Sequence, residues 1–329
     1  MQNFQRSRLQ FQQQFILCFG LALLLFQLVG CAESVSNEEK TSEQTPVIPG
    51  YPLTITDDLE RQVTFDSPPQ RIISLSPSNT ELICSLGLEE RMVGVTTLCD
   101  YPPAVQDVEK VGDFNANSIS LEEIVALKPD LIISGSGFHR DLVTNLERLN
   151  LNVVAVEPKQ LEQIYERLEL LGKICNVNEA ADKLVSSLKE RVERVRREAE
   201  EVKPTPPLKV FYQIWNDPLS STGNVSFIGE MLTTIQVENI FADLNTGYSP
   251  INEEALLIKN PDIILVPMYH GGEKDREAIL SRESWQNIKA IKNNRVHFLP
   301  DDEVSRHGPR FVDGLEAIFK ACYPEASLE

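Results

Sequence analysis

The sequence predicts an α/β protein of two similar lobes with mainly parallel sheets, joined by one long helix, with a ligand cleft between the lobes. A helix–turn–strand segment occurs twice, as LEEIVALKPDLIIS at 121–134 and EEALLIKNPDIILV at 253–266. Short apolar strands alternate with amphipathic helices on either side of the middle of the chain, which is typical of parallel sheets. Between these two series, residues 178–202 have the pattern of one uninterrupted helix.

The duplicated segment indicates two lobes rather than an array of short repeats. A shift of 132 positions places Glu122 on Glu254 and brings the two Pro-Asp turns into register. At this distance each copy belongs to its own lobe. Clefts between lobes are favoured ligand sites, so we expect the binding site there.

The first 50 residues have the pattern of an export signal followed by a tether. Two arginines precede an uncharged, mostly apolar run at 15–30, as in secretory signals. The alternative is an uncleaved anchor, although a spanning helix needs about 20 apolar residues. Leu28-Val29-Gly30-Cys31 resembles a bacterial lipoprotein cleavage motif, which implies removal of residues 1–30 and lipidation of Cys31. Residues 31–50 are polar and acidic, which predicts a flexible tether.

The rest of the chain divides into a first lobe at 51–158, a connecting helical segment at 159–205 and a second lobe at 206–329. In the first lobe we expect a hairpin at 53–65, strands at 71–75, 92–95, 131–133 and 153–156, and helices at 80–86, 120–127 and 142–149. In the second we expect strands at 209–214, 263–266 and 296–299, and helices at 226–234, 252–259, 285–290 and 311–321.

The connecting segment contains the longest predicted helix. Its 25 residues would extend about 37 Å at roughly 1.5 Å per residue. A narrow apolar stripe recurs at helical spacing on a charged surface, formed by Leu184, Leu188, Val192 and Val195. We expect this helix to lie across both lobes and, being stiff, to limit hinge bending.

The net charge disfavours some kinds of binding partner, and the cysteines allow several arrangements. The net charge is −18, and removal of residues 1–30, which hold two of the 31 basic and none of the 49 acidic residues, would make it −20. Such a charge disfavours nucleic acids and anionic membranes. Four cysteines follow the tether, and an exported location permits disulfides. Three full pairings, or buried thiols, remain open for Cys84, Cys99, Cys175 and Cys322.

No motif of an enzyme is present. The chain has no G-x-S-x-G elbow, no H-E-x-x-H and no Walker loop. The SGSG at 134–137 lacks the third glycine and the Lys-Ser/Thr of a phosphate-binding loop. We therefore expect a binding protein without a cofactor of its own.

The loops that follow the predicted strands are rich in aromatic residues. Ligands of open α/β sheets bind outside the carboxyl ends of the strands. This many aromatics on such loops favours a large, flat or macrocyclic ligand held mainly by apolar contact. The aromatic candidates are Tyr101, Phe114, Phe138, Trp215, Tyr248 and Tyr269.

Two of these loops carry an aromatic–histidine pair. Phe138-His139 follows the first repeated strand and Tyr269-His270 follows the second. Imidazole binds cobalt and iron well, so one hypothesis is that His139 or His270 coordinates the metal of a tetrapyrrole axially. The alternative is that both are solvated loop histidines. Few loop arginines are present (Arg140, Arg306 and Arg310), which favours a neutral, amide-rich ligand over an anionic siderophore.

Three stretches of the first lobe resemble a known family. RIISLSPSNTELICSLGL, VGVTTLCDYPP and SLEEIVALKPDLIIS are similar to cobalamin-binding proteins of ABC importers. That class of substrate-binding protein has two Rossmann-like lobes joined by a rigid helix, and it also includes haem and iron–siderophore binders. The resemblance covers about residues 70–320. It implies a lipid-anchored, monomeric protein of the cell envelope that captures cobalamin outside the cytoplasmic membrane. The ligand would pass to a permease dimer with its ATPase, and haem or a ferric siderophore is the alternative ligand.

The resemblance also assigns roles to ligand-binding residues. Tyr101 matches the tyrosine of the DYPP loop, which packs on the corrin, and Phe114 stands near a family tryptophan with two extra residues before the next helix. Tyr248 replaces an aromatic before the second repeated helix. Asp302 and Arg306, in DEVSRHGPR, match an acid and a base that would hydrogen-bond the amide fringe of the corrin.

Glu122 and Glu254 match two glutamates that dock on arginines of the permease, one in each lobe. Both also occupy the first turn of their predicted helices, where the helix dipole favours a carboxylate. The chain departs from the family after residues 131–133, where a tryptophan can occur and this sequence has Gly135 to His139.

Overall fold

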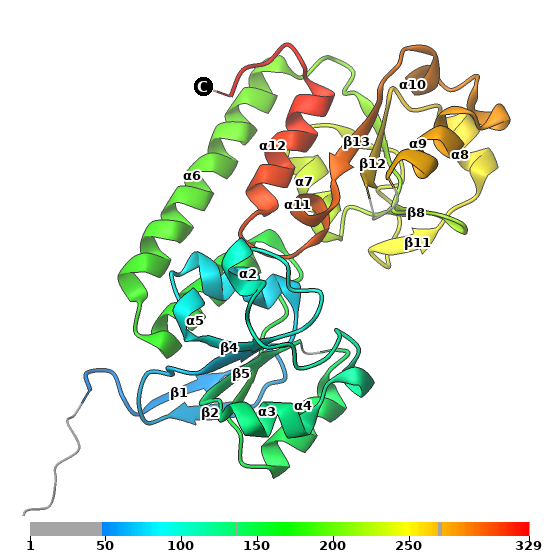
Figure 1. Cartoon of the computed structure of the whole chain (residues 1–329). Helices are drawn as coiled ribbons and strands as arrows, with labels where there is room; N and C mark the ends of the chain where they lie inside the picture. Colours follow the sequence, from blue (N-terminus) through cyan, green and yellow to red (C-terminus); the bar gives the residue numbers. More distant parts are fainter. Residues whose placement is uncertain (1–47, 136, 269–271, 329) are drawn as a thin grey trace, which may run out of the picture. The chain divides into compact units, whose positions relative to one another are not determined.

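Each lobe has a four-stranded parallel sheet at its centre, and the two sheets have the same strand order (Figure 1). The computed structural model describes residues 48–135, 137–268 and 272–328. The first sheet has the order β4-β3-β5-β6 and the second β10-β7-β12-β13. Every neighbouring pair in both is parallel. Within each lobe the order is second, first, third, fourth strand, so the duplicated helix–strand unit holds the same place in both sheets. The expected α/β fold with two similar lobes is confirmed.

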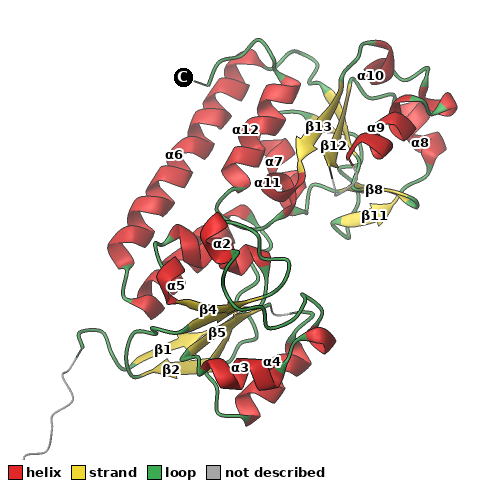
Figure 2. Ribbon diagram, viewed as in Figure 1, coloured by secondary structure: helices red, strands yellow, loops and turns green. Residues whose placement is uncertain are grey.

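The first lobe packs helices on both sides of its sheet (Figure 2). The expected hairpin is present as a separate antiparallel pair, β1 with β2. The strands are β1 (Leu53–Thr56), β2 (Gln62–Phe65), β3 (Ile72–Ser74), β4 (Met92–Val95), β5 (Leu131–Ser134) and β6 (Val153–Ala155), and the helices are α2 (Pro77–Ser85), α3 (Leu121–Leu127) and α4 (Arg140–Arg148). Helix α5 (Leu161–Cys175) belongs to the segment expected to connect the lobes, but it packs on α2 and is described with this lobe.

The second lobe adds a small antiparallel sheet to its parallel one. This sheet has the order β11-β9-β8. The strands are β7 (Lys209–Tyr212), β8 (Trp215–Asn216), β9 (Leu219–Thr222), β10 (Glu238–Asn239), β11 (Tyr248–Pro250), β12 (Ile263–Met268) and β13 (Val296–Pro300). The helices are α7 (Phe227–Thr234), α8 (Glu253–Lys259), α9 (Gly272–Leu280), α10 (Lys289–Lys292), α11 (Asp301–Ser305) and α12 (Phe311–Cys322).

The long helix α6 (Asn178–Val202) runs alongside both lobes (Figure 1). It contacts α5 of the first lobe and α7 and α12 of the second. Its buried face consists of Ala181, Val185, Leu188, Val192, Val195 and Ala199. Beside this face, Arg191 pairs with Glu316 of α12 at 2.7 Å. One continuous apolar core therefore extends from the first sheet through α5 and α6 to α12. Among the described helices, none is both long and apolar enough to span a membrane.

Serine caps start several helices, as their sequences predict. Ser76, Ser120 and Ser226 each accept a hydrogen bond from a first-turn backbone N–H of α2, α3 and α7. Glu123, three residues after Ser120, does not complete a capping box, because the N–H of Ser120 donates to the Val111 carbonyl.

Other predicted elements differ from the structure. The helix expected at 285–290 is wrong, because Glu283–Trp285 forms a 3₁₀ turn and α10 begins at Lys289. The Trp285 side chain is fully buried and its indole N–H donates to Glu253, so this segment follows the packing of one large side chain. Segments expected as loops contain β8, β11 and α11. The four cysteines Cys84, Cys99, Cys175 and Cys322 are free, buried thiols.

Candidate functional site

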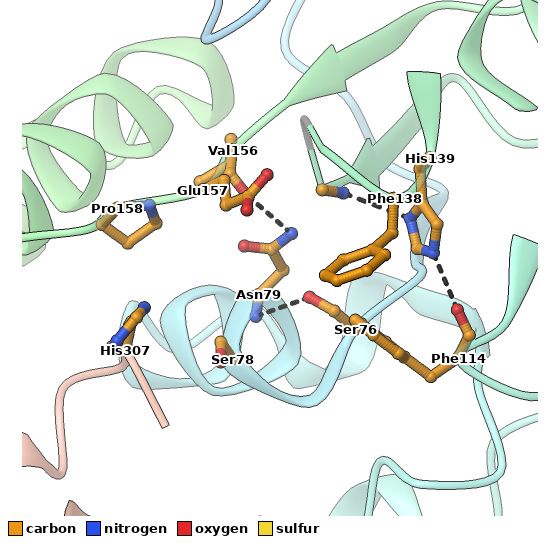
Figure 3. Close-up of a pocket in the computed structure, with 11 residues that line it drawn as sticks. Ser76, Ser78, Asn79, Phe114, Phe138, His139, Val156, Glu157, Pro158 and His307 are labelled. Carbon is orange, nitrogen blue, oxygen red and sulfur yellow. Dashed lines mark hydrogen bonds between the residues drawn. The ribbon is translucent and has the colours of Figure 1, made fainter. Parts of the chain in front are cut away.

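Two adjoining cavities open at the carboxyl ends of the strands, where the α/β fold predicts a ligand site. The larger, of about 720 Å³, takes residues from both lobes. The smaller, of about 120 Å³, is called the inner pocket here and is drawn in Figure 3. Ser76, Ser78 and Phe114 belong to both. The cavities are thus two compartments of one interlobe site.

The larger cavity combines a polar edge with a few apolar side chains. From the first lobe, Leu98 and Asp100 follow β4, and Pro77 begins α2. From the second lobe, Asp302 and Arg306 come from α11 and the residue that ends it. Three predicted ligand-binding residues, Phe114, Asp302 and Arg306, therefore line the cavity.

An ionic network joins the lobes beside this cavity, and we call it the interlobe network. At its centre is Glu81 of α2, which is 2% exposed. Arg306 donates to Glu81 Oε1 at 3.0 Å, and Arg310 donates through Nε and Nη2 at 2.9 and 2.7 Å. Arg306 also pairs with Asp100 and Asp302, and Arg310 with Glu303. The two arginines are thus already paired with carboxylates of the protein.

The network shifts the pKa of its side chains. Burial alone would raise the pKa of Asp100, but the hydrogen bond and charge of Arg306 bring the pKa below its ordinary value. Burial alone would lower the pKa of Arg306, yet the hydrogen bonds of Asp100 and Glu81 raise it. Asp100 and Arg306 are therefore ionised at neutral pH.

The aromatic candidates lie around the site at different positions. Phe114 and Phe138 stand edge to face with centroids 6.1 Å apart, and Phe138 is 81% exposed. Tyr101 is 42% exposed and has the Arg310 guanidinium 4.0 Å from its ring centroid. Trp215 and Tyr248 lie outside both described cavities, on β8 and β11. The strand register places these two on the same face of the small sheet, where both are half-exposed.

His139 does not face solvent as an open loop histidine would. It is fully buried, and its Nε2 donates to the Phe114 carbonyl oxygen at 2.8 Å. Its Nδ1 lies 3.0 Å from Ser134 Oγ and accepts from the backbone N–H of Gly135 at 3.3 Å. In this conformation neither ring nitrogen is open to a metal, so axial ligation would require the ring to leave its place. Instead, the imidazole holds the loop after β5 against Phe114.

The remaining predicted residues lie apart from the cavities or outside the described residues. Glu122 and Glu254 are exposed in the first turns of α3 and α8. Tyr269, His270 and Cys31 fall outside the residues that the structure describes. Among the described residues, no group of three or more His, Cys, Asp or Glu side chains is placed to hold a metal ion.

Several residues of the site carry no clear signal in the sequence. Asn79, Glu81 and Glu157 lie at or beside the cavities, and His307 reaches the inner pocket from the second lobe. The one hint for Glu81 was its position as a carboxylate within the apolar helix sequence of α2, because a buried carboxylate needs a hydrogen-bonding or charged partner. Its partners lie more than two hundred residues further along the chain.

Comparison with known proteins gives consistent results. The sequence profile of the family described as Periplasmic binding protein matches residues 72–303. An uncharacterized ABC transporter substrate-binding lipoprotein of Bacillus subtilis is 33% identical over 315 residues, covering 94% of this chain and 97% of the relative.

Two solved structures share the fold and part of the sequence. A crystal structure of the periplasmic vitamin B12-binding protein of Vibrio cholerae is 28% identical with a TM-score of 0.65, covering 78% of this chain and 97% of that one. A possible iron-binding, periplasmic solute-binding protein of Staphylococcus epidermidis is 30% identical with a TM-score of 0.69, covering 78% of this chain and all of that one.

Proposed function

The chain belongs to the periplasmic binding protein family, and from that premise we propose that it captures cobalamin between its lobes and delivers it to the permease of an ABC importer. This is a family of solute-binding proteins that take part in transport, and it is not a family of enzymes. The choice of ligand rests on the chemistry of the cleft. Likeness to a vitamin B12-binding protein supports the same choice.

The observation that carries the proposal is the pairing of the cleft arginines. Arg306 and Arg310 are surrounded by four carboxylates, those of Glu81, Asp100, Asp302 and Glu303. An anionic ligand would need an uncompensated cation in the cleft, because a buried charge without a partner is costly. Neither arginine offers one. A corrinoid instead presents neutral amide arms, which can donate to Asp302 and accept from Arg306.

The apolar part of the ligand would rest on the aromatic residues around the site. Flat macrocycles pack on aromatic faces with large buried area. We propose Phe114 and Phe138 for the first lobe, with Tyr101 at the edge of the cleft. For the second lobe we propose Trp215 and Tyr248, which share one half-exposed face of the small sheet.

Delivery would use the duplicated helices. Glu122 and Glu254 are exposed and sit at equivalent positions of α3 and α8. Each is followed one turn later by an exposed apolar residue, Val125 and Leu257. Two such patches, one in each lobe, suit a permease dimer with arginines at equivalent positions. Lipidation of Cys31 would hold the protein at the membrane, in keeping with the lipoprotein designation of its relative.

Ligand identity is tested by calorimetry and visible spectra of the purified protein with cyanocobalamin, haem and a ferric siderophore in turn. We expect one-to-one binding of cyanocobalamin alone. Asp302→Asn should weaken this binding about tenfold, since a charged acceptor is replaced. The exposed Asp243→Asn serves as the control. Binding of haem with a shifted Soret band, and not of cyanocobalamin, would refute the cobalamin assignment while leaving the transport role.

Docking is tested separately from binding. Glu122→Arg and Glu254→Arg should reduce uptake of labelled cobalamin by the protein's own importer at least about tenfold, because each places like charges in the contact. Cobalamin affinity should stay unchanged, since both residues lie outside the cavities. Glu123→Arg, on the next exposed position of α3, is the matched control. Equal uptake by all three variants would rule out this docking role.

A further inference from the structure

The inner pocket contains a buried acceptor without a partner. Asn79 is 1% exposed, and its Nδ2 donates to the Val156 carbonyl at 3.1 Å. This bond fixes the amide orientation, because a flipped amide would set oxygen against oxygen. The Oδ1 atom is buried and has no hydrogen-bond partner among the described residues. In Figure 3 it points toward the side of the pocket where Pro158 and His307 lie. Buried acceptors are rarely left unpaired, so this atom indicates a missing donor.

Glu157 provides a second hydrogen-bond acceptor at the pocket, beside the hydroxyl groups of Ser76 and Ser78. The Glu157 carboxylate lines the pocket and accepts from the Gly137 N–H at 2.6 Å. Burial lowers the pKa of His307, although a hydrogen bond to the Pro158 carbonyl and the charge of Glu157 partly oppose this. The imidazole is therefore neutral at neutral pH, with its N–H directed to Pro158. No described lysine or arginine lines the pocket.

We infer that the inner pocket receives a primary amide arm of the ligand and rejects a carboxylate in the same place. The inference rests on the proposed function and narrows it to the kind of corrinoid side chain that this compartment recognises. An amide NH₂ can donate to Asn79 Oδ1 and to Glu157, whereas a carboxylate would face acceptors and a like charge. The volume of about 120 Å³ holds at least about four waters, enough for the four non-hydrogen atoms of –CH₂–CONH₂.

The pocket also lies where an arm of a macrocycle would reach it. It shares Ser76, Ser78 and Phe114 with the larger cavity. A ring in the larger cavity could thus extend one arm past Phe114 toward Asn79. This would satisfy Oδ1, whose burial is unfavourable while it lacks a donor.

The test uses cyanocobalamin and its monocarboxylic acids, in each of which one propionamide arm is a propionate. Affinities are measured by calorimetry with the purified wild-type protein at pH 7.5. One acid should bind about 10- to 100-fold more weakly than cyanocobalamin, because its carboxylate would leave Oδ1 unpaired and face Glu157. The other acids should bind within about threefold of the parent.

Two variants assign the effect to this pocket. Asn79→Ala should weaken cyanocobalamin binding about tenfold and reduce the discrimination against the disfavoured acid. Glu157→Gln should recover binding of that acid, since the like charge is gone. The exposed Asn293→Ala is the matched control and should change nothing.

The outcomes separate the two proposals. If cyanocobalamin binds and every acid binds equally well, the amide inference is refuted and the cobalamin assignment stands. If the discrimination persists in both variants, the inner pocket is not its source and the inference is also refuted. If cyanocobalamin does not bind, the proposed function fails, and the inference fails with it.

Discussion

Glu81 is the residue whose loss should most weaken the contact between the lobes. Its side chain is 1% exposed and accepts three hydrogen bonds from the guanidinium groups of Arg306 and Arg310. The lobes approach so closely here that a Cβ on Gly308 would lie 3.4 Å from Glu81 Oε2. The perturbation is Glu81→Gln, which keeps the size of the side chain and removes its charge.

The magnitude follows from what each arginine keeps. Removing one partner of a buried ion pair costs about 3–5 kcal/mol when the remaining charge is left alone. Here Arg306 retains Asp100 at 2.8 Å and Asp302 at 2.9 Å, and Arg310 retains Glu303 at 2.7 Å. Because both charges stay partly compensated, we expect a loss below that range, about 2–3 kcal/mol in the free energy of unfolding.

The assay is urea unfolding of wild type and variant, followed by circular dichroism at low and at high salt. The loss should persist at high salt, since buried pairs are screened much less than exposed ones. Glu190→Gln, on the exposed side of α6, is the control and should change stability by less than about 0.5 kcal/mol. A Glu81→Gln protein as stable as the control would show that the network does not stabilise the lobe contact.

Three further predictions concern stability and reactivity. Asp57→Asn should lower the free energy of unfolding by about 2–4 kcal/mol in urea, because this buried carboxylate pairs with Arg61 and accepts from three backbone N–H groups; a loss below about 1 kcal/mol would contradict this account. Burial lowers the pKa of His297 and His307, so the unfolded chain takes up protons first, and the melting temperature should fall as pH drops from about 7.5 to 5.5; a flat profile would contradict it. A thiol reagent should modify the four buried cysteines (Cys84, Cys99, Cys175 and Cys322) only after unfolding. Burial raises the pKa of three of them, Cys84, Cys175 and Cys322, to about 12. Rapid reaction of the folded protein would contradict the burial of these thiols.

The lobes could be predicted because local patterns determine their elements. The bounds of α6 and β4 agree with prediction to the residue. An apolar stripe with helical spacing identifies the first, and a short apolar run bounded by turns identifies the second. Duplication of the α3–β5 unit then implied equivalent sheets. Strand order was not predicted, because it depends on pairing between distant segments; duplication implies only that the two sheets share one order, as they do.

Short elements escaped prediction because their pattern is too brief. Strand β8 has two residues and β11 has three, and pairing with β9 rather than periodicity makes them strands. Trp215 and Tyr248 were expected on loops for this reason. Their shared face appears only once the register is known, so the sequence could suggest the aromatic residues but not their alignment.

Some residues of the site could be predicted from the sequence and others could not. Asp302 and Arg306 were identified by resemblance, and both line the larger cavity. One hypothesis made His139 a metal ligand because it follows a strand end, yet its Nε2–H donates to the carbonyl oxygen of Phe114, 25 residues away. Glu81 was not expected, because its arginines come from the other lobe. Long-range polar partners of this kind have no local signature.

The charges that tie the lobes also determine which ligands the cleft can accept. A carboxylate ligand would have to compete with Glu81 or Asp302 for guanidinium groups that they already hold. Displacing a buried carboxylate leaves it without a partner, which costs several kcal/mol. An amide arm displaces nothing, because its NH₂ donates to a carboxylate and its oxygen accepts from an arginine. Stability of the lobe contact and the proposed preference for a neutral ligand thus rest on the same network, and a variant that frees Arg306 should weaken both.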